Sequence, residues 1–379
     1  MEINTDLNPT PHSERNHGIE LLRIFAMLLA AVLHILKKGG VITASEGNLA
    51  AYSTVWLLEA AYCAVNCYAL ISGYVGYSDR PKPLRLARCI ELWLQVVFYS
   101  VIITTVYCIA GVGSVGVSDF ADAFLPVTSK QYWYFTAYIG MFFFIPLLNA
   151  LVRRLNRRAL VSLCIMLIAV FSLYDTFASF WKKDPLALVG GHSPLWLRVL
   201  YIFGAAMKKL RVPESMSSKK ALLIYASAAV FTALFKITGD RLLRFVPGSL
   251  FVRDTSPTVL LCAAALLVAF ARFKPGRKLT EFAVLFAPAA FGVYLLHVSP
   301  LVFEHVIGNR FAFIGRLPFP LIPFAVLASA GVILAVGLAA DKVRILLFKA
   351  LGVPKMCRKA EKSIRRLWMH VVDAAANRE

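Results

Sequence analysis

The sequence is dominated by long apolar runs, and the first of them, GIELLRIFAMLLAAVLHILKKGG, occupies residues 18–40. A hydrocarbon core about 30 Å thick is crossed by a helix of about 20 apolar residues. Similar runs recur along the chain, in which 59% of the residues are hydrophobic and only 16% are charged. Soluble globular domains do not reach this balance. The sequence therefore predicts an all-α, polytopic integral membrane bundle.

Ten apolar runs fit a transmembrane helix, although the sixth is short. They cover residues 18–36, 52–74, 89–111, 133–152, 159–175, 195–208, 221–236, 256–272, 282–303 and 319–340. The first run is too long for the apolar part of a cleavable signal, and no small-residue cleavage site follows it. We therefore expect ten transmembrane helices, the first of which stays in the mature protein.

Lysine and arginine alternate in number between the segments that connect these runs. Counted together with a basic residue that ends the preceding run, the connections after runs two, four, six and eight carry four, four, five and four, whereas those after runs one, three, five, seven and nine carry two, one, two, four and two. Because cytoplasmic loops collect basic residues, both termini are expected in the cytoplasm. The net charge of +20 follows this topology, which argues against nucleic acid as a partner.

The chain divides into three predicted regions. These are a cytoplasmic N-terminal segment (1–17), a transmembrane domain (18–345) and a basic cytoplasmic tail (346–379). The tail contains KMCRKAEKSIRRLWMHVV, in which basic residues alternate with apolar ones such as Leu367 and Trp368. This pattern is typical of an amphipathic helix on the inner leaflet of a bilayer.

Two ionisable side chains interrupt the first run. Arg23 and His34 are eleven residues apart, which places them on one helical face and about 16 Å apart along the axis. Each is costly in lipid and is expected to face the bundle interior. Taken singly, Arg23 fits an interfacial anchor or a partner of Glu20, and His34 fits a structural interhelical hydrogen bond. Together they favour acyl transfer across the membrane. The guanidinium near the cytoplasmic end would hold the phosphates of an anionic acyl donor, and the imidazole near the outer end would take the proton from an acceptor hydroxyl.

The order of several motifs is similar to that of the acyltransferase family 3 membrane proteins. The motifs are the R-x10-H of LLRIFAMLLAAVLHI, NCYALISGYVG, a downstream basic cluster, YWYFTAYIGMFFFIPLL and FGVYLLHVSP. The resemblance covers about residues 15–345. It implies a ten-helix O-acyltransferase that transfers an acyl group, typically acetyl, from cytoplasmic acyl-CoA to a hydroxyl of a cell-envelope glycan or lipid-linked saccharide. Its expected place is the bacterial cytoplasmic membrane.

The resemblance also implies roles for individual residues. His34 matches the essential histidine of the family and Arg23 its essential first-helix arginine. Arg85 and Arg88 resemble the basic residues that follow SGY, where donor phosphates approach. Orientation alone also requires basic residues in this loop.

Further motif residues are expected to support the site rather than to react. Tyr294 and His297 match the Y-L-x-H motif of the family. His297 is expected to orient the acyl donor or His34, and an interhelical structural bond is an equal alternative. Ser72 and Gly73 are expected to end the second helix and to admit another backbone. The YWY stretch at residues 132–134 is interpreted as an interfacial aromatic belt or as a sugar-stacking surface.

The roles of two groups of charged residues are not decided by the sequence. Glu59 and Glu91 lie in apolar runs, so each is expected to pair with a cation or to bind a proton. Four basic residues break the charge asymmetry on the outer connection after the seventh run, and we hypothesise that they attract an anionic acceptor. These residues are Lys236, Arg241, Arg244 and Arg253.

No metal and no bound cofactor are expected. Cys63 and Cys67 lie one helical turn apart, but two thiols alone make a poor zinc site. Acyl-CoA enters as a co-substrate, with acetyl-CoA as the expected form. The competing prediction is a transporter or flippase for an envelope glycan or its precursor, in which the ionisable residues line a path and no chemical change occurs.

Overall fold

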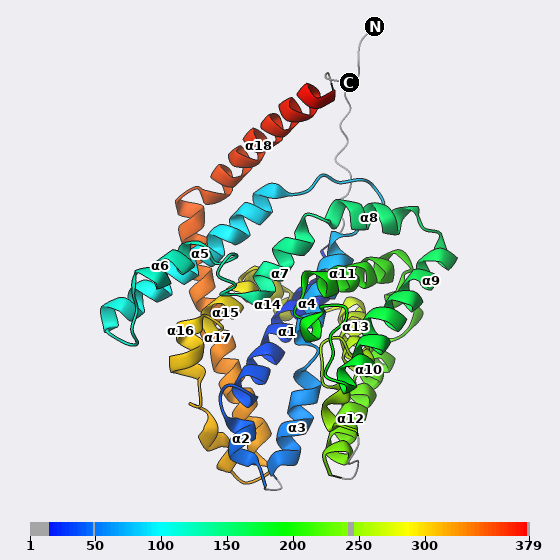
Figure 1. Cartoon of the computed structure of the whole chain (residues 1–379), viewed down its shortest axis with the longest axis vertical. Helices are drawn as coiled ribbons and strands as arrows, with labels where there is room; N and C mark the ends of the chain where they lie inside the picture. Colours follow the sequence, from blue (N-terminus) through cyan, green and yellow to red (C-terminus); the bar gives the residue numbers. More distant parts are fainter. Residues whose placement is uncertain (1–14, 48–49, 242–245, 377–379) are drawn as a thin grey trace.

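The computed structural model describes residues 15–47, 50–241 and 246–376 of the chain. Within these ranges the chain is predominantly helical and has no β-strand. Figure 1 shows the helices gathered into one bundle, from one end of which α18 (Val353–Ala376) projects. The fold class predicted from the sequence is confirmed.

Seven helical runs in the described residues are long and apolar enough to cross a membrane. They are α1 (His17–Leu36), α3 with α4 (Ala50–Ala61 and Ala64–Gly76), α5 (Leu86–Ala110), α9 with α10 (Arg157–Ile168 and Asp175–Phe180), α12 (Ser218–Arg241), α14 with α15 (Arg277–Phe286 and Ala290–His297) and α17 (Leu321–Ala350). An eighth forms if α7 (Trp133–Phe142) and α8 (Ile145–Arg154), which meet at a bend of 57°, count as one span.

The two remaining predicted spans coincide with α11 (Pro194–Lys209) and α13 (Pro257–Arg272), apolar helices of 16 residues each. All ten predicted runs are thus helical, whereas the number that crosses the membrane and the cytoplasmic termini stay predictions. The division into three regions also stays a prediction, because α17 continues to Ala350 and residues 1–14 and 377–379 lie outside the described residues.

Short elements join the long helices. They are α2 (Val41–Ser45), α6 (Val117–Phe124), α16 (Pro300–Val302), the 3₁₀ turns η2 (Val189–Gly191), η3 (Val212–Ser215), η4 (Gly248–Phe251), η5 (Ala287–Ala289) and η7 (Ala312–Arg316), and the π-helical segments η1 (Ala169–Tyr174) and η6 (Phe303–Ile307). Breaks between α3 and α4 and between α14 and α15 interrupt two of the spans. Irregular backbone at membrane depth persists only where protein covers it or where it lines a cavity.

The first helix, α1, occupies the centre of the bundle. It packs against α3, α4, α13, α14, α15 and α17, and Figure 1 shows it running from the middle of the bundle toward α2, at the end away from α18. Its start is fixed by Asn16, whose side chain accepts a hydrogen bond from the Ile19 N–H at 3.1 Å and donates one to the Ala271 carbonyl at 2.9 Å. A helix enclosed in this way can hold polar groups only toward other helices.

A buried ion pair ties α17 to its neighbours. Arg344 donates to the two carboxylate oxygens of the fully buried Asp341 at 2.9 and 2.7 Å. Gln95 and Tyr99 of α5 donate to the same carboxylate at 2.9 and 3.1 Å. Gly292 of α15 packs against it, since a Cβ at this position would lie 2.3 Å from the carboxylate. The charges of the network are therefore fully paired, as a low-dielectric interior requires.

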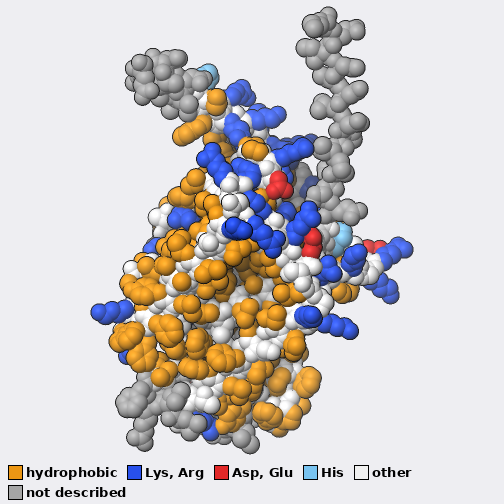
Figure 2. All heavy atoms as spheres, turned by 90° about the vertical axis from the view of Figure 1, so that its right-hand side faces the viewer, with side chains coloured by type: hydrophobic (Ala, Val, Ile, Leu, Met, Phe, Trp, Pro, Cys, Tyr) orange, Lys and Arg blue, Asp and Glu red, His pale blue; other side chains and the backbone are white. Residues whose placement is uncertain are grey.

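The C-terminal helix α18 is docked onto the start of α5. Glu361 accepts hydrogen bonds from the backbone N–H groups of Leu86 and Ala87 at 3.2 and 3.3 Å. Its ion pair with Arg365 holds the pKa of the Glu361 carboxyl below its ordinary value. Leu367 and Trp368 of the same helix are exposed, which agrees with the amphipathic pattern. In Figure 2, Lys and Arg side chains gather toward the end that carries α18, beyond a largely hydrophobic body.

The Asp341 network predicts an asymmetric effect on stability. Asp341→Ala leaves Arg344 buried without its counter-charge, so the free energy of unfolding should fall by about 3–5 kcal/mol. Thermal unfolding of the detergent-solubilised protein measures the change. The control is Glu281→Ala, which breaks the exposed Arg277–Glu281 pair and should change stability by less than about 1 kcal/mol. Equal unfolding temperatures for Asp341→Ala and the parent protein would contradict the assignment.

Candidate functional site

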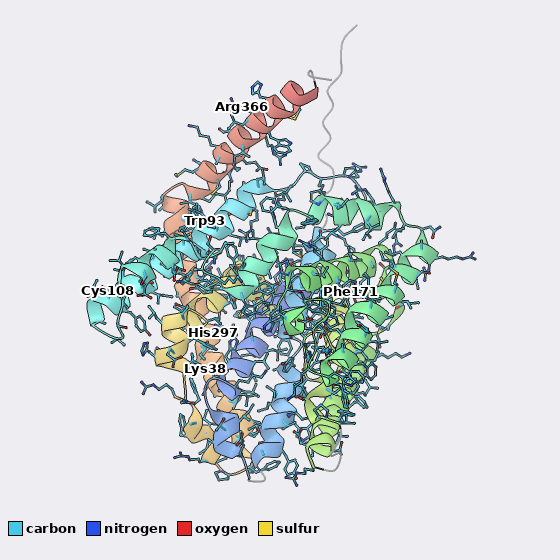
Figure 3. All side chains as sticks on the ribbon, viewed as in Figure 1. Lys38, Trp93, Cys108, Phe171, His297 and Arg366 are labelled. Atoms are coloured by element: carbon cyan, nitrogen blue, oxygen red, sulfur yellow. The ribbon has the colours of Figure 1, made fainter. Side chains whose placement is uncertain are left out.

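Two histidines from distant parts of the sequence meet inside the bundle. His34 lies near the C-terminal end of α1, and His297 is the last residue of α15. Their side chains are joined by a hydrogen bond of 2.9 Å between His34 Nδ1 and His297 Nε2. His297 is buried and His34 is partly exposed. Figure 3 places His297 on α15 beside α1, close to Lys38 at the end of α1. The structure thus joins the histidines of two motifs that are far apart in the sequence, as expected if His297 orients His34.

The hydrogen-bond partners determine where the protons of this pair reside. His297 Nδ1 bonds the carbonyl oxygen of Val293, and a carbonyl can only accept, so this nitrogen carries a proton. In the neutral ring His297 Nε2 is then an acceptor, and His34 Nδ1 must donate to it. His34 Nε2 is consequently left with a free lone pair, and it bonds no group in the described chain. The pair therefore presents His34 Nε2 as a proton acceptor.

The segment at residues 303–309, which follows α15 along the chain, covers the end of α1 beside His34, and we name it the strap. Phe303 places its ring edge against the His34 ring, with the centroids 5.2 Å apart. The Asn309 N–H donates to the Lys38 carbonyl at 2.9 Å, and Lys38 pairs with Glu304. This pairing lowers the pKa of the Glu304 carboxyl. The strap holds the C-terminal end of α1, and with it His34, in a defined position.

Arg23 faces the bundle interior from the opposite end of the same face. Its guanidinium is partly exposed and donates no hydrogen bond within the described residues, and the charges and hydroxyls that act on it include those of Tyr68, Arg88 and Tyr138. These groups belong to α4, α5 and α7, so Arg23 is no lipid-facing anchor. The charge of Glu20, the alternative partner, also acts on Arg23, but no ion pair joins the two side chains within the described residues, and Glu20 lies 3.1 Å from His17. Arg23 is thus a partly exposed cation that forms no ion pair within the described residues.

Tyrosines occupy the region between Arg23 and His34. The rings of Tyr68 and Tyr134 lie 6.3 Å apart and those of Tyr134 and Tyr294 lie 6.2 Å apart, both edge to face. Tyr68 donates to the Arg23 carbonyl at 2.8 Å, and the Tyr134 N–H contacts the Tyr294 hydroxyl at 3.4 Å. Met27 lies on the α1 face between Arg23 and His34, and it belongs to the apolar cluster that also contains Tyr294.

Two of these tyrosine hydroxyls can still form hydrogen bonds with a ligand. Neither the Tyr134 nor the Tyr138 hydroxyl bonds another described group, although both side chains are only partly exposed. We name Tyr68, Tyr134, Tyr138 and Tyr294 the tyrosine wall. It connects the arginine end of α1 to the histidine end with aromatic surface and with free hydrogen-bond donors.

The aromatic-belt interpretation of residues 132–134 is wrong. Tyr132 is fully buried and donates to the Leu295 carbonyl at 3.1 Å, and Tyr134 belongs to the tyrosine wall. Trp133 stacks on His192, with the ring centroids 4.0 Å apart. The reason is that a protein carbonyl replaces interfacial water as the partner of the Tyr132 hydroxyl, which draws the start of α7 into the bundle.

The basic loop before α5 divides into two parts. Arg88 is exposed, pairs with Glu91 at 3.2 Å and lies close enough to act electrostatically on Arg23. Glu91 thus has the cationic partner expected of it. Arg85 is the exposed N-cap residue of α5 and makes no ion pair in the described chain. The structure associates Arg88 with Arg23, whereas the role of Arg85 stays a prediction.

The SGY motif is a helix-packing site. A Cβ on Gly73 would lie 2.0 Å from the Tyr201 carbonyl of α11, so the expected close approach of a second backbone is confirmed. The expected helix end is off by two residues, because the run was expected to end at Tyr74 and α4 continues to Gly76. Ser72 donates to the Tyr68 carbonyl at 2.9 Å within the same helix, which satisfies its hydroxyl and leaves the helix unbroken.

Sequence reasoning missed Tyr68 and Tyr138 as parts of the site. Tyr134 and Tyr138 lie one turn apart, as do Tyr294 and His297, so helical spacing was the signal that could have united them. Tyr68 carries no such signal, because aromatic residues are common in apolar helices.

The comparisons with known proteins identify the family of the chain. Residues 16–340 match the family model described as an acyltransferase domain, the family suspected from the motifs. No curated protein and no solved structure shows a match to the chain. The matched region contains Arg23, the tyrosine wall and both histidines. Because the model covers most of the chain, this multi-pass membrane protein belongs to acyltransferase family 3 and is a transferase.

Proposed function

We propose that the protein transfers an acyl group, acetyl in the simplest case, from cytoplasmic acyl-CoA to a hydroxyl of a cell-envelope saccharide on the opposite side of the membrane. Family membership supplies the acyltransferase activity. The observation that supports the mechanism is the order of hydrogen bonds from the Val293 carbonyl through His297 to His34. This order leaves His34 Nε2 as an unprotonated base at the end of a fixed chain.

The reaction needs no protein nucleophile. As the acceptor hydroxyl oxygen attacks the thioester carbonyl carbon, His34 Nε2 takes the hydroxyl proton. The new C–O bond forms and the C–S bond breaks, and the proton on His34 passes to the departing CoA sulfur. His34 is then neutral again. While His34 is protonated, its Nδ1–H still donates to neutral His297, so the imidazolium keeps its partner throughout.

The arginine end of α1 suits the charged part of the donor. CoA carries phosphate groups, and a guanidinium binds phosphate oxygens in a bidentate manner. The Arg23 guanidinium bonds no described group, and Arg88 lies near it. The flexible pantetheine arm would then follow the tyrosine wall, where the Tyr134 and Tyr138 hydroxyls can donate to its amide carbonyls. This path brings the thioester toward His34, about 16 Å along the helix axis from Arg23.

The first prediction concerns the base. His34→Ala should lower acyl transfer by about 10²–10⁴-fold, because it removes the proton acceptor, while membrane insertion stays normal. Inverted vesicles that enclose envelope saccharide and receive radiolabelled acetyl-CoA on their outer, cytoplasmic face measure label on the saccharide. His17→Ala, at the other end of the same helix, is the control and should retain activity. Full transfer by His34→Ala would defeat the proposal, and saccharide movement without label would favour the transporter.

The second prediction concerns the donor. Arg23→Gln should raise the KM for acetyl-CoA about tenfold or more, because a charge-assisted hydrogen bond to phosphate is lost. The KM for S-acetyl-N-acetylcysteamine, a thioester without phosphates, should not change. Arg277→Gln, which alters an exposed arginine, is the matched control. An equal rise for both donors would show that Arg23 does not bind phosphate.

A further inference from the structure

A polar cluster at the histidine end of α1 is unused by the mechanism described so far. It combines residues from the end of α1, from α3 and the break after it, from the start of α7, and from the segments that precede α11 and α13. We name it the outer cluster, and its members are Lys37, Glu59, Tyr62, Trp133, His192 and Asp254.

Glu59 is the member that most needs a partner. It is 2% exposed, and neither of its carboxylate oxygens has a hydrogen-bond partner within the described residues. The charges of Lys37 and Lys236 act on it, yet each bonds another group: Lys37 donates to the Tyr62 hydroxyl at 3.2 Å, and Lys236 pairs with Asp240 at 3.0 Å. Buried carboxylates normally accept hydrogen bonds. A ligand that donates hydrogen bonds would complete this one.

Asp254 provides a second carboxylate on a rigid support. Asn66 donates to its backbone carbonyl at 2.7 Å, and Trp196 in turn donates to the Asn66 side chain at 3.1 Å. One carboxylate oxygen lies 3.1 Å from His192 Nε2, and the His192 ring stacks on Trp133. The His192 side chain is 48% exposed, so this part of the cluster is reached from outside. Flat aromatic surface beside a fixed carboxylate is a common arrangement for binding a polar ring.

The outer cluster adjoins the histidine pair from two sides. Lys37 follows His34 by one turn of α1, and its charge acts on His34. The charges of Glu59 and Asp254 both act on Lys37 and Tyr62, so the two carboxylates are near this pair. On the other side, Trp133 precedes Tyr134 of the tyrosine wall. The cluster thus contacts the end of α1 through Lys37, one turn from the proposed base.

We propose that the outer cluster is the acceptor subsite and that it takes an uncharged polyhydroxylated ring, a neutral saccharide unit, beside the reacting hydroxyl. This inference rests on the proposed function for the direction of transfer. Glu59 and Asp254 accept hydrogen bonds from ring hydroxyls, and the Trp133–His192 stack forms a flat wall. Two carboxylates at this distance from the base repel a phosphate or carboxylate on the same ring.

An uncharged acceptor differs from the anionic acceptor that we hypothesised from the sequence. Of the four basic residues that suggested it, Lys236 is paired with Asp240, and Arg241 lies over the Tyr52 ring at 4.8 Å. Arg244 lies outside the described residues. Arg253 acts on Tyr62 and Asp175 through its charge, but its buried Nε has no hydrogen-bond partner within the described residues. Two of the four cations of the anion hypothesis are thus engaged, and the charge of the acceptor is decided by the experiment below.

The experiment supplies two classes of acceptor to the full chain in inverted vesicles. Envelope saccharides are separated by anion exchange into neutral and anionic fractions, each fraction is enclosed within the vesicles as they form, and radiolabelled acetyl-CoA is added outside, on the cytoplasmic face. The subsite predicts label in the neutral fraction. Label confined to the anionic fraction would overturn it. No label in either fraction would contradict the proposed function and the subsite together.

Two variants then test the residues. Glu59→Gln and Asp254→Asn should each raise the half-saturating concentration of the neutral fraction about tenfold and leave the KM for acetyl-CoA unchanged. Both variants should elute from size-exclusion chromatography in detergent at the volume of the parent protein, which would show that they fold. Glu46→Gln, an exposed carboxylate after α2, is the matched control. An unchanged half-saturating concentration in both variants would refute the subsite even if transfer to saccharide is confirmed.

Discussion

The hydrogen bond between His34 and His297 is the interaction on which the proposed chemistry depends. A histidine in an apolar bundle has two nitrogens to satisfy, and the ordinary solution is to bond both. Here the Val293 carbonyl fixes the proton of His297, His297 fixes the proton of His34, and the last nitrogen of the series is left without a partner in the described chain. Each ring is held in one tautomer by its neighbour. The base is thus prepared by backbone geometry rather than by a nearby carboxylate.

The position of this pair depends in turn on how α1 is held. Asn16 joins its start to α13, and the strap after α15 joins its end to the rest of the chain. Between these ends the tyrosine wall supplies a polar and aromatic surface inside an otherwise apolar bundle. The Asp341–Arg344 network holds α17 and α5 against α15, the helix that carries Tyr294 and His297. Substrates that approach from opposite sides would meet on a helix that does not move relative to its neighbours.

Much of this arrangement follows from the sequence, and the remainder shows where sequence reasoning ends. Run lengths predicted the helices, and helical periodicity predicted that Arg23 and His34 share an inward face, because local geometry decides both. The partner of His34 lies 263 residues away, and Glu59 has no hydrogen-bonded cation within the described residues, although the charges of Lys37 and Lys236 act on it. Such pairings depend on which helices are adjacent, which periodicity does not encode. Tyr132 was misplaced for a related reason, since its carbonyl partner belongs to a distant helix.

The most direct test of the account is the tautomer of His34 itself. Nitrogen-15 NMR of the histidine-labelled protein in lipid bilayers distinguishes protonated from unprotonated ring nitrogens, and His34→Gln identifies which signals belong to this residue. The account predicts, at neutral pH and without substrates, a neutral His34 ring with its proton on Nδ1 and a bare Nε2. A proton found on Nε2, in the other tautomer or in an imidazolium, would contradict the central claim that the hydrogen-bond chain prepares this nitrogen as the base.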